Sequence, residues 1–309
     1  MSEILAPCGA MESLTAAVNA GADAVYLGEE YFSARKNADN FTAEQLCDAV
    51  RFCHYSGVKV YVTLNTLVFD REIPLLAKAI ENCAKADVDA FIVQDMGVAR
   101  LARQIVPELP LHASTQMTVN SPEGAIMAKE LGFTRVVLGR ELSFAQIKAI
   151  TESCDIETEL FVHGALCVCI SGQCYMSSVL GGRSGNRGLC AQPCRLDFTS
   201  GDRHNVLSLK DLSLTEKLPE LAKAGITSFK IEGRMKQPEY AAGVVSVYRK
   251  YIDYYINACL RTDEVTAKKD FKVTKEDIQH LYDFGNRSGF TDGYYKRHNG
   301  RETVSYTHL

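Results

Sequence analysis

Residues 42–64 read TAEQLCDAVRFCHYSGVKVYVTL and contain one helix followed by one strand. Thr42 with Gln45 forms a capping-box pattern, which predicts the start of a helix. Four apolar side chains then recur on one helical face: Leu46, Ala49, Val50 and Cys53. Gly57 supplies the left-handed turn that commonly ends a helix, and an apolar strand follows at residues 58–64.

The same unit recurs along the chain, and short apolar strands that alternate with helices must pair in parallel. We expect eight strands, near residues 3–6, 24–27, 58–64, 90–94, 110–113, 135–138, 157–162 and 228–231. Eight such units close into a (β/α)8 TIM-type barrel, an α/β fold. An open doubly wound sheet is the alternative, but it usually needs a glycine-rich phosphate loop after the first strand, and residues 7–11, PCGAM, are not one.

Three segments are predicted. The barrel spans residues 1–261, and a cysteine-rich insertion at 164–204 interrupts it in the loop after the seventh strand. That loop lies at the carboxyl ends of the strands, the face where barrel enzymes keep their chemistry. Residues 262–309 form a small, partial C-terminal extension with a helix at 274–284. No element can be placed at residues 304–309, and we expect the natural chain to continue beyond Leu309.

Composition limits the class of protein. No run of eighteen apolar residues exists, so no membrane-spanning helix is expected, and the first residues do not have the pattern of a secretory signal. We therefore expect a cytoplasmic protein without a membrane partner. A formal net charge of −4 gives no global argument for nucleic-acid binding, although it leaves room for a local basic patch. The eleven cysteines are odd in number and argue against a complete disulfide framework.

Four cysteines in the insertion form the main candidate site, with the spacing Cys167-x6-Cys174-x15-Cys190-x3-Cys194. Thiolates are soft ligands that suit iron–sulfur clusters and zinc. Structural zinc usually uses Cys-x2-Cys pairs, and their absence favours a cluster over zinc. Cys169 is a fifth thiol, either an alternative ligand or a packing residue. Buried structural thiols are the alternative for the whole group.

These motifs resemble the collagenase-like peptidase family U32, and the resemblance covers nearly the whole chain. It is carried by residues 112–116 (HASTQ), 159–167 (ELFVHGALC), 172–177 (GQCYMS), 182–188 (GRSGNRG), 190–195 (CAQPCR) and 230–236 (KIEGRMK).

The resemblance implies one of three functions. Some members are oxygen-independent hydroxylation proteins that act on a tRNA wobble uridine, on ribosomal RNA or on a quinone precursor, and several carry a 4Fe–4S cluster. It therefore implies an RNA-hydroxylating enzyme, with tRNA as partner, prephenate as co-substrate, and a 4Fe–4S cluster, or alternatively zinc, on the four cysteines. The alternatives are a collagenase-like peptidase and a non-catalytic, cluster-bearing subunit of a hydroxylation complex.

Several polar residues are expected at the carboxyl ends of the strands. His163 ends the seventh strand and is either an acid–base group or a structural histidine. Glu232 and Arg234 follow the eighth strand and are further catalytic candidates, and Lys230 lies within it. With Gln116 and Arg140, Lys230 is predicted to bind an anionic small molecule; a salt-bridge lattice or helix capping is the alternative.

Arg183 and Arg187 lie in the cysteine-rich insertion, together with Arg195. They are predicted to grip RNA phosphates, or to stabilise an anionic cluster. A peptidase would need a nucleophile–base pair or a metal with an activating carboxylate. The chain contains no His-Glu-x-x-His motif and no Gly-x-Ser-x-Gly motif, so the nucleophile would be a thiol of the insertion.

Overall fold

The structure is a computed structural model that describes residues 2–36, 38–296, 303–304 and 307–308. It confirms the TIM-type barrel, because eight parallel strands close on themselves where β10 pairs with both β7 and β1. The barrel strands are β1 (Glu3–Pro7), β2 (Ala24–Gly28), β3 (Lys59–Leu64), β4 (Ala90–Val93), β5 (Leu111–Ala113), β6 (Arg135–Val137), β7 (Glu157–Gly164) and β10 (Ser228–Ile231). Each of the eight expected strands is present.

Helices connect these strands around the outside of the barrel. They are α1 (Met11–Asn19), α2 (Ala43–Tyr55), α3 (Ile73–Lys85), α4 (Met96–Ile105), α5 (Pro122–Glu130), α6 (Phe144–Ser153), α8 (Leu218–Lys223) and α9 (Pro238–Arg261). The predicted capping box at Thr42 is formed, since its hydroxyl accepts from Gln45 N and the Gln45 side chain accepts from Thr42 N. The apolar face of α2 is buried, as its spacing indicates.

The core has two parts. The larger part lies between the helices and the outer face of the barrel. The interior of the barrel holds a much smaller apolar group, Leu5, Ala24, Tyr26, Tyr61, Ala90 and Ile92. TIM-barrel interiors are usually filled by branched apolar side chains. Here charged side chains, such as Glu159 and Arg135, occupy part of that space.

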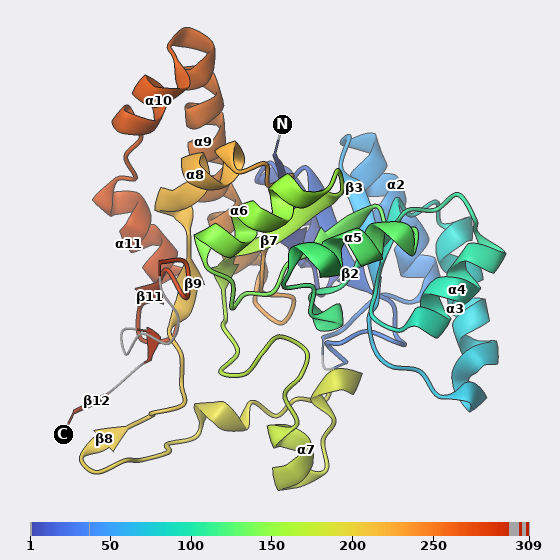
Figure 1. The fold of residues 1–309 in the computed structure, drawn as a ribbon. Helices are drawn as coiled ribbons and strands as arrows, with labels where there is room; N and C mark the ends of the chain where they lie inside the picture. The colour runs from blue at the N-terminus through green and yellow to red at the C-terminus, as the bar shows by residue number, and fades with distance from the viewer. Residues whose placement is uncertain (1, 37, 297–302, 305–306, 309) are drawn as a thin grey trace.

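The cysteine-rich insertion follows β7 and stands away from the ring of helices (Figure 1). It contains the short helix α7 (Met176–Gly181) and β8 (Arg203–His204), and it ends at β9 (Asp211–Ser213), which pairs antiparallel to β7. We call the segment from Ala165 to Arg195 the roof.

The C-terminal extension packs on the barrel rather than away from it. Its helices are α10 (Glu264–Asp270) and α11 (Lys275–Asp283), and the latter confirms the helix expected at 274–284. Strand β11 (Phe290–Thr291) pairs parallel with β9. Within residues 304–309, where the sequence placed no element, Val304 bridges Leu209 and β12 (Thr307–His308) pairs with β8, while residues 305, 306 and 309 lie outside the described residues. These partners lie far away in sequence, so the local pattern could not reveal them.

None of the described helices has both the length and the apolar composition needed to cross a membrane.

Candidate functional site

Arg234 lies at the carboxyl end of the barrel, where polar side chains that follow several strands meet. Its guanidinium is buried and donates to the hydroxyl of Ser33 over 2.7 Å and to that of Thr63 over 3.0 Å. Burial, with the nearby charge of Arg35, lowers the pKa of Arg234 to about 10, so the side chain is still cationic at neutral pH. The backbone approaches closely here, because a Cβ on Gly9 would lie 2.0 Å from the carbonyl oxygen of Arg234.

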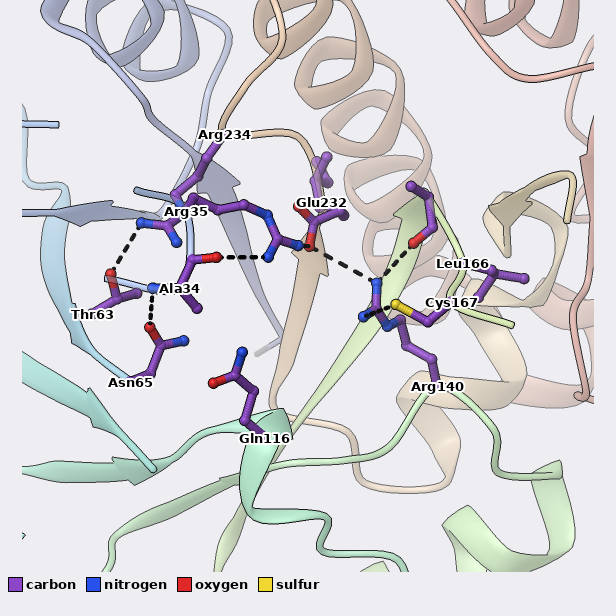
Figure 2. Close-up of polar contacts among 12 residues, drawn as sticks. Ala34, Arg35, Thr63, Asn65, Gln116, Arg140, Leu166, Cys167, Glu232 and Arg234 are labelled. Atoms are coloured by element: carbon purple, nitrogen blue, oxygen red, sulfur yellow. Dashed lines mark hydrogen bonds and ion pairs between the residues drawn. The ribbon is translucent and has the colours of Figure 1, made fainter. Parts of the chain in front are cut away.

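Glu232 is the carboxylate at the centre of this group (Figure 2). Its Oε2 lies 3.2 Å from Nη2 of Arg35 and 3.9 Å from Nη1 of Arg140. Burial raises the pKa of Glu232, but Arg35, Arg140 and Arg234 outweigh it and hold this pKa below its usual value. Three arginines therefore surround one ionised carboxylate. We call Arg35, Glu232, Arg140 and Arg234 the mouth cluster, and its excess of positive charge suits an anionic ligand.

Amide side chains complete the same region. Gln116 is nine-tenths buried, and its Oε1 has no hydrogen-bond partner. Figure 2 shows its side chain between Asn65 and the mouth cluster. The Oδ1 atom of Asn65 accepts from the backbone N–H of Ala34 over 3.0 Å, which positions the loop that carries Arg35. A buried amide oxygen without a partner is costly, so Gln116 is well placed to accept a hydrogen bond from a ligand.

Lys230 lies inside the barrel and is not exposed at the mouth. Its Nζ is 2.6 Å from Oε1 of Glu159 and 4.2 Å from the centre of the Tyr26 ring. Oε2 of Glu159 is 3.3 Å from Nη1 of Arg135, which also reaches Glu3 over 2.7 Å. The predicted substrate contact of Lys230 is therefore replaced by a buried ion pair. This is the salt-bridge lattice that the sequence left open as the alternative.

The roof packs tightly against the mouth. A Cβ on Gly172 would lie 2.6 Å from Cα of Gln116, and one on Gly188 would lie 2.6 Å from the carbonyl oxygen of Ser33. Both glycines have positive φ angles, +77° and +79°, which other L residues rarely adopt. The roof can follow the loops beneath it closely only because these two positions lack a side chain.

Arg187 and Arg183 differ in what they contact. Arg187 anchors the roof, because its guanidinium pairs with the Glu72 carboxylate over 2.5 Å and lies 4.6 Å from the Phe69 ring centre. Arg183 is exposed and its Nε donates to the carbonyl of Leu189 over 3.1 Å. Arg195, the third arginine predicted to bind RNA, is half-buried and donates to the carbonyl oxygens of Leu166 and Leu209 over 2.6 Å. Of the three, Arg183 is the one that remains exposed.

The four candidate ligand cysteines lie in the roof, and Cys167 contacts the mouth cluster. Nη2 of Arg140 donates to Sγ of Cys167 over 3.5 Å. Burial raises the pKa of Cys194, the charge of Arg195 lowers it, and the nearby thiols, those of Cys167, Cys190 and Cys174, add to the rise. The thiols of Cys167, Cys190 and Cys174 thus lie near enough to Cys194 to affect its pKa.

These thiols are soft donors of the type that iron–sulfur clusters and zinc use. In the described part of the chain, however, no group of three or more His, Cys, Asp or Glu side chains is arranged to hold a metal ion as it stands. The residues therefore fit such a centre by donor type and neighbourhood, and binding requires the sulfurs to move closer together.

His163 belongs to β7, and its ring packs against aromatic rings of α9 and β11. Its ring centre is 5.6 Å from that of Tyr248 and 5.2 Å from that of Phe290, and its Nδ1 is 3.3 Å from the Tyr248 hydroxyl. Burial, with a smaller effect of Lys236, lowers the pKa of His163 to about 3. The ring is therefore neutral at physiological pH and is 1% exposed, which favours a structural role over acid–base catalysis.

Sequence reasoning missed Arg35. It follows β2 in a loop of more than ten residues, and its pKa is raised chiefly by Glu232. The available signal was a cation in an unusually long loop at the carboxyl end of a strand. Of the predicted residues, the structure brings together Glu232, Arg234, Arg140 and Gln116, with Cys167 beside them.

Comparison with known proteins adds the family. Residues 9–305 match the sequence model of the family described as Peptidase family U32. The chain is 38% identical over 303 residues to tRNA hydroxylation protein P1 of Bacillus subtilis, covering 94% of this chain and 70% of that protein. It is 42% identical over 262 residues to the 23S rRNA 5-hydroxycytidine C2501 synthase of Escherichia coli, covering 82% of this chain and 40% of that protein.

A further curated relative and one solved structure are also similar to this chain. A collagenase of Porphyromonas gingivalis is 35% identical over 328 residues, covering 99% of this chain and 75% of that protein. The solved structure of the U32 peptidase Mk0906 is 19% identical with a TM-score of 0.47, covering 54% of this chain and 70% of that one. The relatives thus include proteins named for RNA hydroxylation and for proteolysis. With its profile matched over nearly the whole length, the chain belongs to peptidase family U32.

Proposed function

We propose that this protein is an RNA-hydroxylating enzyme that acts on a tRNA wobble uridine in the cytoplasm, with prephenate as co-substrate and a 4Fe–4S cluster on the roof. One observation supports this proposal above the others. Arg140 faces Glu232 of the mouth cluster with Nη1, at 3.9 Å, and the thiol of Cys167 with Nη2, at 3.5 Å. A single guanidinium therefore joins the anion-binding region to the proposed cluster ligands.

The mouth cluster suits a small molecule with carboxylates. Arginine binds carboxylates through two parallel hydrogen bonds, and three arginines are present for one internal carboxylate. Prephenate carries two carboxylates, so Arg35 and Arg140 would bind it while Glu232 keeps its own charge. The free Oε1 of Gln116 would accept a hydrogen bond from a hydroxyl of the ligand. The roof would exclude water from above.

Cys167, Cys174, Cys190 and Cys194 would hold the cluster. A cluster with four cysteine ligands has no open iron, so it would supply electron transfer or structural support. Zinc at the same thiols would be structural. Cys169 accompanies this set, and its thiol interacts with that of Cys174.

Two measurements test the proposal. In a strain that lacks the gene, mass spectrometry of tRNA nucleosides should show the loss of a hydroxylated uridine. The wild-type gene should restore it, Cys190→Ser should not, and Cys259→Ser, which changes a thiol outside the roof, should restore it. Unchanged nucleosides in the deletion strain would exclude tRNA as the substrate.

The second measurement addresses the metal. Protein purified without oxygen should contain iron and sulfide and absorb visible light, and Cys190→Ser should lose that absorption. One equivalent of zinc in a colourless protein would replace the cluster with the zinc alternative.

A collagenase-like peptidase is the second candidate, because a relative over 99% of this chain carries the name collagenase. Three histidines form side-chain hydrogen bonds with a carboxylate or a tyrosine rather than with a thiol: His54 with Asp89, His204 with Asp197 and His163 with Tyr248. Cleavage of gelatin by metal-free protein, abolished by Cys167→Ser, would favour this candidate. Copurification with another chain, without activity alone, would favour the non-catalytic subunit.

A further inference from the structure

An exposed apolar surface lies on the roof, around α7. Tyr175, Val179 and Leu180 are 60%, 81% and 61% exposed. Figure 1 shows α7 apart from the helices that surround the barrel. Three large apolar side chains within six residues form an uncovered patch of a kind that usually marks an interaction site.

The patch is linked to two of the cysteines by the chain itself and by one hydrogen bond. Tyr175 follows Cys174 in sequence, and the hydroxyl of Ser177 in α7 accepts from the backbone N–H of Ala191 over 3.0 Å. Ala191 in turn follows Cys190. The patch is therefore connected to Cys174 and Cys190 of the roof, which packs against the mouth.

Positive charge accompanies the patch. Residues 164–196 contain three arginines and no Asp or Glu, whereas the whole chain has a formal net charge of −4. Arg183 is held by the carbonyl oxygen of Leu189, and Arg287 donates to Oε1 of Gln192 over 2.7 Å. Both arginines thus contact neutral oxygens of residues that flank Cys190 in the sequence, and these contacts leave their positive charge uncompensated.

We propose that Tyr175, Val179, Leu180, Arg183 and Arg287 form a docking surface for unpaired nucleotides of RNA. This inference rests on the proposed function and specifies how its substrate is held. An enzyme that modifies a base takes that base out of the stack, so the neighbouring nucleotides must rest on protein beside the entrance. Tyr175 would stack on a neighbouring base, and the two arginines would contact phosphates.

Charge and size favour RNA over other occupants. A lipid surface is disfavoured because helices that lie in the membrane interface need an extended apolar face, and α7 has six residues. A second copy of this acidic chain would also bring net negative charge, so self-association is an outcome that the test must separate from RNA binding. RNA satisfies the aromatic, apolar and cationic parts of the surface together.

The test is the affinity of the purified, anaerobically prepared protein for an unmodified tRNA transcript and for its isolated anticodon stem-loop. Tyr175→Ala should weaken binding about fivefold or more, as expected for loss of a stacked base. The double change Val179→Ser with Leu180→Ser should also weaken binding, because it removes the apolar surface beside that base. Arg183→Gln should lower the slope of log affinity against log salt by about 0.7–0.9, the effect of one phosphate contact.

Matched controls exist on the opposite face of the barrel. Tyr55 at the end of α2 is 95% exposed, and Val265 in α10 is 73% exposed. Tyr55→Ala and Val265→Ser should leave the affinity unchanged. The inference is overturned if the roof variants bind RNA as tightly as these controls do, or if they alter only self-association or binding to lipid vesicles.

The two proposals fail in different ways. If the deletion strain keeps normal nucleosides while the roof variants still lose RNA affinity, the docking surface stands and tRNA hydroxylation falls. If hydroxylation depends on the gene but Tyr175→Ala and the double variant show normal affinity and normal hydroxylation, the docking surface alone is wrong.

Discussion

Replacing Glu159 with Gln removes the carboxylate that neutralises Lys230 inside the barrel. Glu159 is fully buried, with Oε1 2.6 Å from Nζ of Lys230. Removing one partner of a buried pair typically costs about 3–5 kcal/mol, because the other charge is left without compensation. Arg135 keeps its ion pairs with Glu3 and Glu157 after the change, so only Lys230 is stranded. We therefore expect the free energy of unfolding to fall by about 3 kcal/mol, near the lower end of that range.

The pH dependence of this loss has a definite sign. Burial lowers the pKa of Lys230 even in the native protein, and the nearby charge of Glu159 opposes that shift. Without Glu159 the pKa of Lys230 should fall further. The unfolded state then binds more protons than the folded state between the two pKa values, so stability rises as pH increases through this window. The defect of Glu159→Gln should thus be smaller at pH 9 than at pH 6.

Urea unfolding at the two pH values measures both effects. Glu159→Gln combined with Lys230→Met should recover much of the loss, because no charge remains stranded. Glu152→Gln provides the surface control, since its partner Lys148 lies 3.5 Å away and both side chains are more than half exposed. That change should cost less than about 1 kcal/mol. A cost as small for Glu159→Gln, or a defect that grows with pH, would refute the reasoning.

Three further predictions concern the site. Arg35→Gln should raise the KM for an anionic co-substrate about tenfold. Its effect on the free energy of unfolding should be smaller, because the Arg35 side chain is about one-third exposed. An unchanged KM would show that Arg35 does not bind the co-substrate. Between about pH 6.5 and 3, the wild-type histidine is charged only in the unfolded state, so acidification lowers the free energy of unfolding. His163→Phe should reduce that loss. Urea unfolding that shows equal acid sensitivity in the two proteins would contradict this. Gly172→Ala should displace the roof from Gln116, so limited proteolysis should cleave the roof faster than in the wild type. Gly181→Ala is the control, because a Cβ there meets open space. Equal cleavage of the two variants would show that the close contact at Gly172 is not needed.

Local patterns in the sequence were enough to predict the barrel. Each helix–strand unit carries its own signals, such as the capping box at Thr42 and the turn at Gly57, and these act between residues close in the chain. Eight repeats of that unit leave few ways to bury the apolar faces other than a closed parallel barrel. The four cysteines were equally visible, because isolated structural thiols rarely gather in one glycine-rich loop.

Only the tertiary structure decided which polar groups meet. Lys230 and Glu159 are 71 residues apart, and the pairing of β10 with β7 brings them to 2.6 Å. The pairings of β1 with β10 and with β2 bring the loop of Arg35 to Glu232, and His163 of β7 faces Tyr248 of α9. Periodicity tells which face of a strand is buried, but barrel closure and strand register determine what a buried charge faces. That is why the sequence indicated a polar mouth, whereas the roles of Lys230, His163 and Arg35 emerged only from the folded chain.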